Sequence, residues 1–363
     1  MLRNSRDPEN ACGKGQIIGP GDLILITGAA GFIGSRVVAM LLGRGFGNLR
    51  CFVRPSGTAG LLERLADARG SSRMQVFTGN LLSGEDCHAA AKDASVIIHL
   101  AAGTGQKSYP EAFLNSVVTT RNLLEAALRH KCLKRFVNIS SFSVYTNTGK
   151  SSGRLLDESC PVETMPALRG EAYCFAKVKQ DELLREYHRR FRVPYVTIRP
   201  GYVYGPGKRA ISGRVGIDTF GLFLHLGGGN KIPLTYVDNC ADAIALAAIR
   251  DGIADGEVFN VVDDDLPSSR QFLRLYKQRV KPFASLYVPH AVSYVLCWLW
   301  EKYSAWSEGQ LPPAFNRKRW NADWRSTRYS NAKLKKLLGW TPGVSTAEGL
   351  KRYFAACRDY QHA

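Results

Sequence analysis

Seven short hydrophobic runs recur along the first 262 residues and alternate with longer stretches in which hydrophobic residues fall at helical spacing. The runs are rich in β-branched and aromatic residues and almost continuously hydrophobic, which is typical of strands in a parallel sheet that helices cover on both faces. The predicted strands are 23–27, 49–54, 74–80, 95–102, 135–141, 195–200 and 257–262. The predicted helices are 32–44, 58–69, 84–92, 109–130, 171–191 and 239–250. This alternation predicts an α/β fold with a doubly wound parallel sheet.

The pattern changes after Pro200, where glycine and aromatic residues dominate, and the last hundred residues show helical spacing without matching strands. This change predicts a second, smaller and mostly helical domain, inserted at the carboxyl ends of the later strands. The polar N-terminal stretch has no hydrophobic segment and is expected to be a flexible tail. The predicted boundaries are 1–21 for the tail, 22–200 plus 235–263 for the sheet domain, and 201–234 plus 264–358 for the second domain.

Composition narrows the function classes. Of the 363 residues, 45% are hydrophobic and 22% are charged, values typical of a soluble globular protein. The net charge of +18 favours phosphate-bearing or otherwise acidic partners. No zinc finger, arginine-rich helix or RNP-like motif is present in the sequence, so nucleic-acid binding is not expected. The nine cysteines show no metal-binding spacing, so we expect no metal and reduced thiols in a cytoplasmic protein.

One segment departs from this picture. Residues 282–300 contain no Asp, Glu, Lys or Arg. Their length is marginal for a membrane span, and the segment includes Pro289 and His290. A helix that is buried or lies at an interface is therefore favoured over a span, and peripheral contact with a membrane stays open as an alternative.

A glycine-rich loop follows the first predicted strand and leads into the first helix. It reads TGAAGFIG from Thr27 to Gly34. Gly28 permits a tight turn, Gly31 lets backbone N–H groups approach a pyrophosphate, and Gly34 lets the helix pack closely on the strand. With a strand before it and a helix after it, the loop predicts a dinucleotide site, so the sheet domain is expected to be a Rossmann domain.

The choice of cofactor is expected to depend on the end of the second strand, where an acidic side chain would bind the adenosine ribose hydroxyls. This chain has Arg54 there. An arginine can pair with a 2′-phosphate, which favours NADP over NAD. The alternative is that Arg54 stacks on adenine or faces solvent, in which case NAD is used.

Two further segments carry candidate chemistry. Tyr173 and Lys177 stand four residues apart near the start of a predicted helix, so both lie on one helix face. A nearby ammonium would lower the pKa of the Tyr173 phenol and make it an acid/base. The fifth strand ends in Ser140, Ser141 and Ser143, and a hydroxyl at this end of the sheet can hold the reacting oxygen. The pattern alone does not decide which serine acts.

Together these segments resemble the extended short-chain dehydrogenases/reductases, also called the NAD-dependent epimerase/dehydratase family, over about residues 23–355. Further matches support the resemblance. They are GNL (79–81), HLAA (99–102), SSFSVY (140–145), YCFAK (173–177), RPGYVYGPG (199–207), YVDNCADAI (236–244) and LGWTP (338–342).

The resemblance implies roles for individual residues. Ser141 would be the catalytic serine, because it lies four residues before Tyr145, and Lys177 would also bind the nicotinamide ribose. Cofactor contacts are implied for Gly28, Gly31, Phe32, Ile33, Gly34, Arg54, Asn80, Leu81, Ala101, Ala102, Tyr173 and Lys177. Substrate contacts are expected from Ser143, Tyr204, Lys208 and Arg209. Family members often pair through the helix that carries Tyr173 and Lys177, so a homodimer is expected.

The expected function is that of an NAD(P)-dependent epimerase/oxidoreductase acting at a carbinol or keto carbon of a nucleotide-activated or lipid-linked sugar. Family dehydratases carry an Asp-Glu pair after the catalytic hydroxyl residue, and Phe142-Ser143 stands there, so dehydration is not expected. The alternative is an NADP-dependent reductase or dehydrogenase of a hydrophobic hydroxy/keto substrate, such as a sterol or polyketide. A cofactor-binding regulator without catalysis is disfavoured, because Ser141, Tyr173 and Lys177 are all present.

Overall fold

The computed structural model describes residues 15–55, 59–68, 70, 73–103, 108–146, 153–219, 221–308, 310 and 315–362. Most of the predicted tail lies outside these residues. Its last part, however, is packed in the structure. Ile18 is buried, and the backbone N–H of Ile17 donates to the carbonyl of Ile249 at 2.9 Å. The fixed structure therefore begins several residues earlier than predicted, because two isoleucines join the hydrophobic core.

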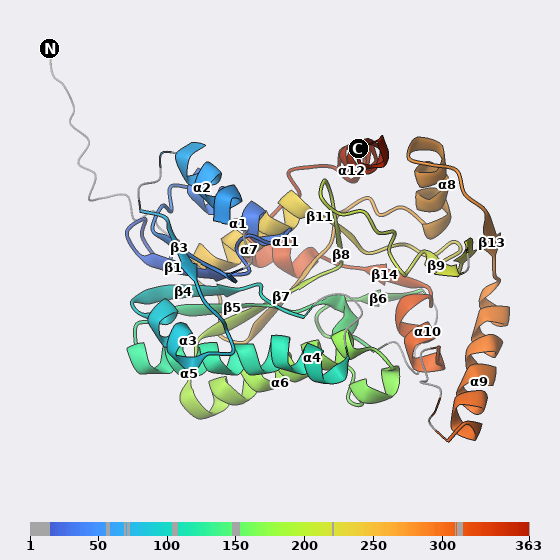
Figure 1. Ribbon diagram of the computed structural model, residues 1–363, viewed down its shortest axis with the longest axis horizontal. Coiled ribbons are helices and arrows are strands. Elements are labelled where there is room, and N and C mark those ends of the chain that lie inside the picture. The colour runs from blue at the N-terminus through green and yellow to red at the C-terminus, as the bar shows by residue number, and fades with distance from the viewer. Residues whose placement is uncertain are drawn as a thin grey trace, which may run out of the picture.

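A seven-stranded sheet forms the centre of the molecule, in the order β12-β7-β5-β4-β1-β2-β3, and every pairing in it is parallel (Figure 1). The predicted α/β fold with a doubly wound parallel sheet is confirmed. The strands are β1 (Leu23–Thr27), β2 (Leu49–Val53), β3 (Gln75–Thr78), β4 (Ala94–His99), β5 (Arg135–Ile139), β7 (Tyr195–Pro200) and β12 (Glu257–Val261). Six of the seven lie within the runs that predicted them, and β4 begins one residue before its run, at Ala94.

Helices cover both faces of the sheet, and each face has its own hydrophobic cluster. On one face are α1 (Gly34–Gly43), α2 (Ala59–Ala68), α7 (Val237–Ile249) and α11 (Ala332–Leu338). On the other are α3 (Gly84–Ala91), α4 (Tyr109–Phe113), α5 (Thr119–His130) and α6 (Ala172–Phe191). The predicted helix over 109–130 is interrupted by a π-helical turn, Leu114–Val118, which joins α4 to α5.

The remaining chain forms a second region beside the carboxyl ends of the strands, on the right of Figure 1. Its helices are α8 (Ser269–Arg279), α9 (His290–Trp306), α10 (Arg317–Asp323) and α12 (Thr346–His362). Short strands pair within it or with inserted loops: β6 (Arg154–Leu156), β8 (Tyr202–Tyr204), β9 (Gly216–Thr219), β10 (Leu222–His225), β11 (Leu234–Tyr236), β13 (Ser285–Tyr287) and β14 (Thr327–Tyr329). The expectation of helices alone after residue 264 is corrected by β13 and β14. Their partners, β10 and β6, lie far away in sequence.

The hydrophobic 282–300 segment is divided between β13 and the first part of α9. Pro289 ends the extended stretch, because its fixed backbone angle suits the position just before a helix. No helix among the described residues is long and apolar enough to cross a membrane. Of the two expected placements, burial is not observed, since Ser293, Cys297 and Ser304 are the buried residues of α9, and the placement at an interface stays a prediction.

The strand order places a ligand crevice. From β1 the chain runs outward through β2 and β3, and it then returns to β4 and continues in the opposite direction. In such sheets ligands bind beyond the carboxyl ends of the strands at the point where the order reverses. That point lies between β1 and β4, next to the end of β5.

Candidate active site

The glycine-rich loop between β1 and α1 is shaped to receive an anion. Gly28 has a φ of +69°, and a Cβ there would lie 3.0 Å from the backbone nitrogen of Ala101. A Cβ at Gly34 would lie only 2.1 Å from the carbonyl oxygen of Gly28. Helix α1 therefore starts in direct contact with the loop, and only glycine fits at Gly34. None of the described side chains caps this helix and no acidic residue lies in its first turn, so its N–H groups can bind a pyrophosphate.

Ser141, Tyr173 and Lys177 meet at the carboxyl end of β5. The Ser141 hydroxyl accepts a hydrogen bond from the backbone N–H of Ser143 at 3.1 Å and is also bonded to Tyr173. Lys177 Nζ donates to the carbonyl oxygen of Ile139, the last residue of β5, at 2.6 Å. The three side chains thus lie within one turn of α6 and the two residues that follow β5, as the spacing predicts.

The neighbouring serines have other surroundings. The Ser140 hydroxyl donates to Asp181 at 3.0 Å, and Asp181 is paired with buried Arg199 at 2.9 Å. The Ser143 hydroxyl oxygen is buried and has no hydrogen-bond partner among the described residues. Ser141 is therefore the serine that lies against Tyr173, which the sequence pattern left open.

Burial sets the acidities in this cluster. It lowers the pKa of Lys177 to about 8, although the nearby Asp181 carboxylate acts in the opposite direction. Burial also raises the pKa of Tyr173, and its hydrogen bond with Ser141 only partly offsets this. A lowered pKa of Tyr173, expected from the sequence, stays a prediction for the enzyme with its positively charged nicotinamide bound.

A chain of buried polar side chains leads from Lys177 back to the glycine-rich loop. Lys177 Nζ donates to Gln180 Oε1 at 2.9 Å, and Gln180 Nε2 donates to Thr120 Oγ1 at 2.8 Å. His99 joins Thr120 to Thr27 through its two ring nitrogens, at 2.9 and 2.7 Å. Thr27 is the last residue of β1, so the chain connects α6 to the glycine-rich loop through β4 and α5.

Counting donors shows that the hydrogen bonds of this chain converge on Thr120 from both ends. The hydroxyl hydrogen of Thr120 is directed to the carbonyl of Ser116, so Thr120 Oγ1 accepts from both Gln180 and His99. His99 then carries its proton on Nε2, and its Nδ1 accepts from the hydroxyl of Thr27. A neutral ring agrees with the pKa of His99, which burial lowers to about 3 with a further contribution from the Lys177 ammonium.

Sequence reasoning missed this chain. His99 does stand in the HLAA motif, but Thr120 and Gln180 lie inside helices without any distinguishing spacing.

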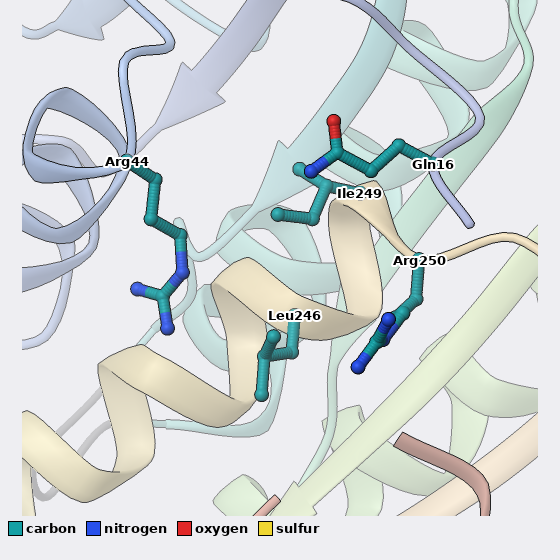
Figure 2. A pocket seen from close by; sticks show the side chains of 5 residues that line it. All are labelled: Gln16, Arg44, Leu246, Ile249 and Arg250. Carbon is teal, nitrogen blue, oxygen red and sulfur yellow. The ribbon is translucent and has the colours of Figure 1, made fainter. Parts of the chain in front are cut away.

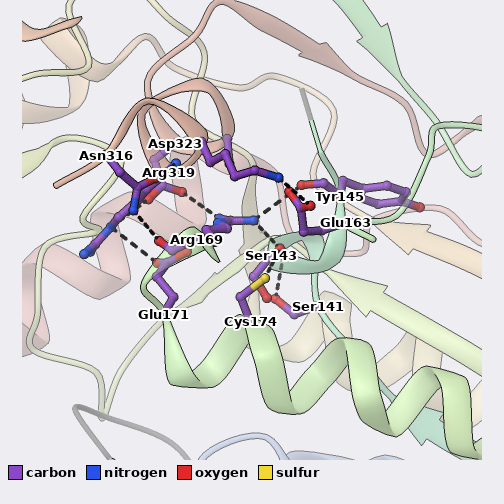
Figure 3. A network of polar contacts seen from close by, with 12 residues as sticks. Ser141, Ser143, Tyr145, Glu163, Arg169, Glu171, Cys174, Asn316, Arg319 and Asp323 are labelled. Carbon is purple, nitrogen blue, oxygen red and sulfur yellow. Dashed lines mark hydrogen bonds and ion pairs between the residues drawn. The ribbon is translucent and has the colours of Figure 1, made fainter. Parts of the chain in front are cut away.

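A second polar network surrounds Arg169, just before α6 (Figure 3). The guanidinium donates to the carbonyls of Ser143 and Tyr145 and forms ion pairs with Glu171, at 2.6 Å, and Asp323, at 3.5 Å. Burial lowers the pKa of Arg169, but the two carboxylates outweigh this and raise it above its usual value. The network ties the loop after β5 and the start of α6 to α10 of the second region.

Comparison with known proteins identifies the family. Residues 24–261 match the NAD dependent epimerase/dehydratase family. The chain belongs to this family. The expected resemblance is thereby confirmed, and so is the expectation of an NAD(P)-dependent enzyme of the extended short-chain dehydrogenase/reductase type, while the expected preference for NADP stays a prediction.

Relatives and similar structures cover different shares of the chain. A UDP-glucose 4-epimerase from Mycolicibacterium smegmatis is 28% identical over 344 residues, which are 90% of this chain and 96% of that protein. The uncharacterized UDP-glucose epimerase YtcB of Bacillus subtilis is 31% identical over 195 residues, which are 51% of this chain and 58% of that protein.

Among solved structures, a Bacillus cereus UDP-glucuronic acid 4-epimerase in complex with UDP-glucuronic acid and NAD has a TM-score of 0.69 at 24% identity. It covers 93% of this chain, which in turn covers 99% of it. A dTDP-glucose 4,6-dehydratase from Streptomyces venezuelae with NAD bound has a TM-score of 0.68 at 21% identity, with 93% and 98% covered. At these identities the likeness shows the shared fold.

The other predicted cofactor residues of this family member lie in the glycine-rich loop or follow the carboxyl ends of β2, β3 and β4. Phe32 lies in the glycine-rich loop, and Ile33 directly precedes α1. The backbone N–H of Ala101, next to Ala102, donates to Thr27 at 3.3 Å. Arg54 follows β2 and is exposed. Two more follow β3: Asn80, exposed, with its side-chain oxygen bonded to the N–H of Leu82, and Leu81, which is buried.

The predicted substrate residues lie in different surroundings. Gly207 lies against the Phe32 ring, so the loop that carries Lys208 borders the cofactor loop. The Arg209 guanidinium instead lies 4.1 Å from the centre of the Tyr360 ring on α12. The expectation that Tyr204 contacts the substrate is wrong. It is fully buried, and its hydroxyl donates to Asp263 at 3.3 Å. An aromatic residue at a strand exit was mistaken for a ligand contact, whereas it packs in the core of the second region.

A pocket of about 280 Å³ lies apart from these residues, beside the C-terminal end of α7 (Figure 2). It is lined by Gln16, Arg44, Leu246, Ile249 and Arg250. Arg44 follows α1 and is paired with Asp242 of α7. The pocket is therefore at the opposite end of α1 from the glycine-rich loop, and it contains none of the predicted catalytic or cofactor residues.

Proposed function

We propose that this chain is an NAD-dependent epimerase of a nucleotide-activated sugar, with Ser141, Tyr173 and Lys177 as its catalytic residues. The observation that supports this most directly is the meeting of all three side chains at the end of β5, beside the uncapped start of α1. Relatives named as UDP-glucose epimerases, one of them aligned over nearly its whole length, indicate the substrate class.

In this proposal, bound NAD supplies the acceptor and donor for a hydride at the carbinol carbon. Tyr173 removes the hydroxyl proton of the sugar as that carbon is oxidised and returns it when the carbon is reduced from the other face. Ser141 donates a hydrogen bond to the same oxygen and holds it next to Tyr173. The Lys177 ammonium, fixed by Ile139 and Gln180, stabilises the negative charge that forms on Tyr173.

Dehydration is not part of the proposal. Phe142 stands at one of the two positions where family dehydratases have acidic residues, and it is buried against Tyr145 and Tyr329. At the second position, the Ser143 hydroxyl has no acidic partner among the described residues. Neither side chain can therefore protonate a leaving hydroxyl and recover the proton.

The test is to incubate the purified protein with UDP-glucose, UDP-galactose, UDP-glucuronic acid and dTDP-glucose, and to follow the products by NMR. We expect a 4-epimer from at least one of these substrates without net consumption of cofactor. A 4-keto-6-deoxy product, or no turnover of any nucleotide sugar, would contradict the proposal.

A second candidate is an NADP-dependent reductase or dehydrogenase of a hydrophobic ketone or alcohol, and Arg54 is the observation that favours it. Its side chain is exposed beyond β2 and makes no ion pair with the other described residues, so it is available to a 2′-phosphate. The discriminating measurement is the ratio of the dissociation constants for NAD and NADP, in the wild type and in Arg54→Ala. A preference for NADP that is lost in Arg54→Ala would support the reductase, and tight retention of NAD would support the epimerase.

We also propose a homodimer that forms through α6. Sedimentation of the protein at several concentrations tests this assembly, and a monomer throughout would contradict it.

A further inference from the structure

Helix α9 has an exposed surface that is unusually hydrophobic. Among the described residues, 21 large hydrophobic side chains are exposed, and ten of these lie within residues 286–306. On α9 itself they are Val292, Tyr294, Val295, Leu296, Trp298, Leu299, Tyr303 and Trp306. Contiguous exposed apolar surface of this kind marks an interaction site in most proteins. We call these eight side chains the α9 face.

The α9 face is broad. With about 100° of rotation per helical residue, the exposed positions cover an arc of about 200°, and Lys302 is the one charged residue on it. The buried positions, Ser293, Cys297 and Ser304, occupy a narrower arc on the opposite side. The usual order is therefore inverted, since small and polar side chains face the protein and large apolar ones face outward.

The polar side of α9 is firmly attached, so the outward orientation of the α9 face is fixed. The Ser293 hydroxyl accepts a hydrogen bond from Trp320 Nε1 at 2.8 Å. Glu301 is paired with Arg317 at 2.8 Å. A rotation of the helix that buried its apolar side would break both contacts and place serines and a carboxylate in solvent-facing positions.

The charge next to the α9 face is positive. Residues 269–281, which form α8 and the link to β13, include five basic residues and no acidic one. In Figure 1, α8, β13 and α9 follow one another along one edge of the molecule. A basic segment that continues into an apolar helix with Trp and Tyr side chains fits the headgroup and acyl boundary of an anionic bilayer.

We propose that α9 lies in the surface of an anionic lipid membrane and holds the enzyme there. Lipid suits the α9 face better than a second copy does, because a helix pair buries a seam much narrower than the arc exposed here. The aromatic residues add to this fit, since Tyr and Trp present a polar atom to water and an apolar ring to lipid. At 17 residues, α9 lies along the membrane and does not cross it.

The test is flotation of the purified full-length protein with vesicles of phosphatidylcholine, with and without phosphatidylglycerol. We expect the protein to float with the anionic vesicles and to be released by high salt. The variant Val295→Glu/Leu299→Glu, altered at the centre of the α9 face, is expected to reduce the bound fraction at least about tenfold. The variant Arg279→Glu/Lys281→Glu is expected to weaken binding to anionic vesicles alone.

The matched control is Leu61→Glu/Leu337→Glu, which changes two leucines that are similarly exposed on α2 and α11. It is expected to float like the wild type. None of these residues belongs to the catalytic or cofactor site, so turnover without vesicles stays unchanged, and failure here is distinct from failure of the proposed function. The proposal is overturned if the wild type does not float, if Val295→Glu/Leu299→Glu floats equally well, or if that variant converts a wild-type dimer to a monomer.

Discussion

Burial of Lys177 should make the stability of the protein depend on pH in a measurable way. Its pKa in the folded protein, about 8, lies below the 10.5 of an exposed lysine. Between these values the unfolded chain binds more protons than the folded one, so stability rises with pH through this window. The cost of keeping the ammonium buried is fully present below pH 8 and disappears above about 10.5. For this one group the expected gain between pH 7 and pH 10 is about 2–3 kcal/mol.

The replacement Lys177→Met removes this dependence. It also leaves the Ile139 carbonyl and Gln180 Oε1 without a donor, which costs about 1–3 kcal/mol for each group. That cost is nearly the same at every pH. The test therefore uses the change of the unfolding free energy with pH and not its absolute value. We expect the unfolding free energy of the wild type, minus that of Lys177→Met, to increase by about 2–3 kcal/mol from pH 7 to pH 10.

Urea unfolding followed by circular dichroism at four or five pH values measures this difference. Lys179→Met is the matched control, because Lys179 lies on the same helix with its side chain 38% exposed, and its replacement should leave the slope of the wild type unchanged. A constant difference between the wild type and Lys177→Met across the range would refute the reasoning. It would mean that water or a carboxylate solvates Lys177 far better than its surroundings indicate.

Three further replacements test the site. Tyr173→Phe is expected to lower kcat about 10³-fold with little change in the midpoint of thermal unfolding, because only the acid/base hydroxyl is removed; a loss below tenfold would exclude that role. Gly34→Ala should abolish NAD binding in calorimetry and lower the free energy of unfolding by about 1–3 kcal/mol, since its Cβ would lie 2.1 Å from the Gly28 oxygen. The control Gly84→Ala, with open space around the new methyl group, should have neither effect. Gln180→Leu should lower kcat about tenfold and shift the basic limb of its pH profile to lower pH, because the Lys177 ammonium loses an acceptor. Gln180→Glu should restore that limb, and an unshifted profile in Gln180→Leu would mean that Gln180 has a purely structural role.

The parts of the structure that depend on local pattern were predictable. Near-continuous hydrophobic runs indicated all seven strands of the main sheet, because a strand buried on both faces cannot alternate. Tyr173 and Lys177 were predicted to share a helix face because their spacing is a single helical turn. The strand end offered three serines, and Ser141 was chosen among them by the family resemblance alone. The π-helical turn at Leu114–Val118 has no comparable signal, and neither do β13 and β14, whose pairing depends on distant segments.

The sequence could not show whether an apolar side chain faces the core of the protein or its surface. Tyr204 and the eight side chains of the α9 face are all large and aromatic or apolar, yet Tyr204 is fully buried and those of the α9 face are exposed. Hydrophobicity predicts that a residue prefers to leave water, but it does not say whether its own core or another surface receives it. Similarly, Thr120 and Gln180 look like ordinary helical residues until α5 and α6 are packed beside His99.

The hydrogen-bond chain between Lys177 and Thr27, which converges on Thr120, has a consequence for how this protein can evolve. Each member donates in one direction only, so replacing His99 by a residue of different donor pattern would leave Thr27 or Thr120 with a mismatched neighbour in a dry interior. Substitutions along the chain should therefore be epistatic: harmful singly, and tolerated where a second change restores the pairing of donor and acceptor. In the proposed mechanism, His99, Thr120 and Gln180 do not contact the substrate. Their replacement would nevertheless be restricted, because they hold Lys177 in place.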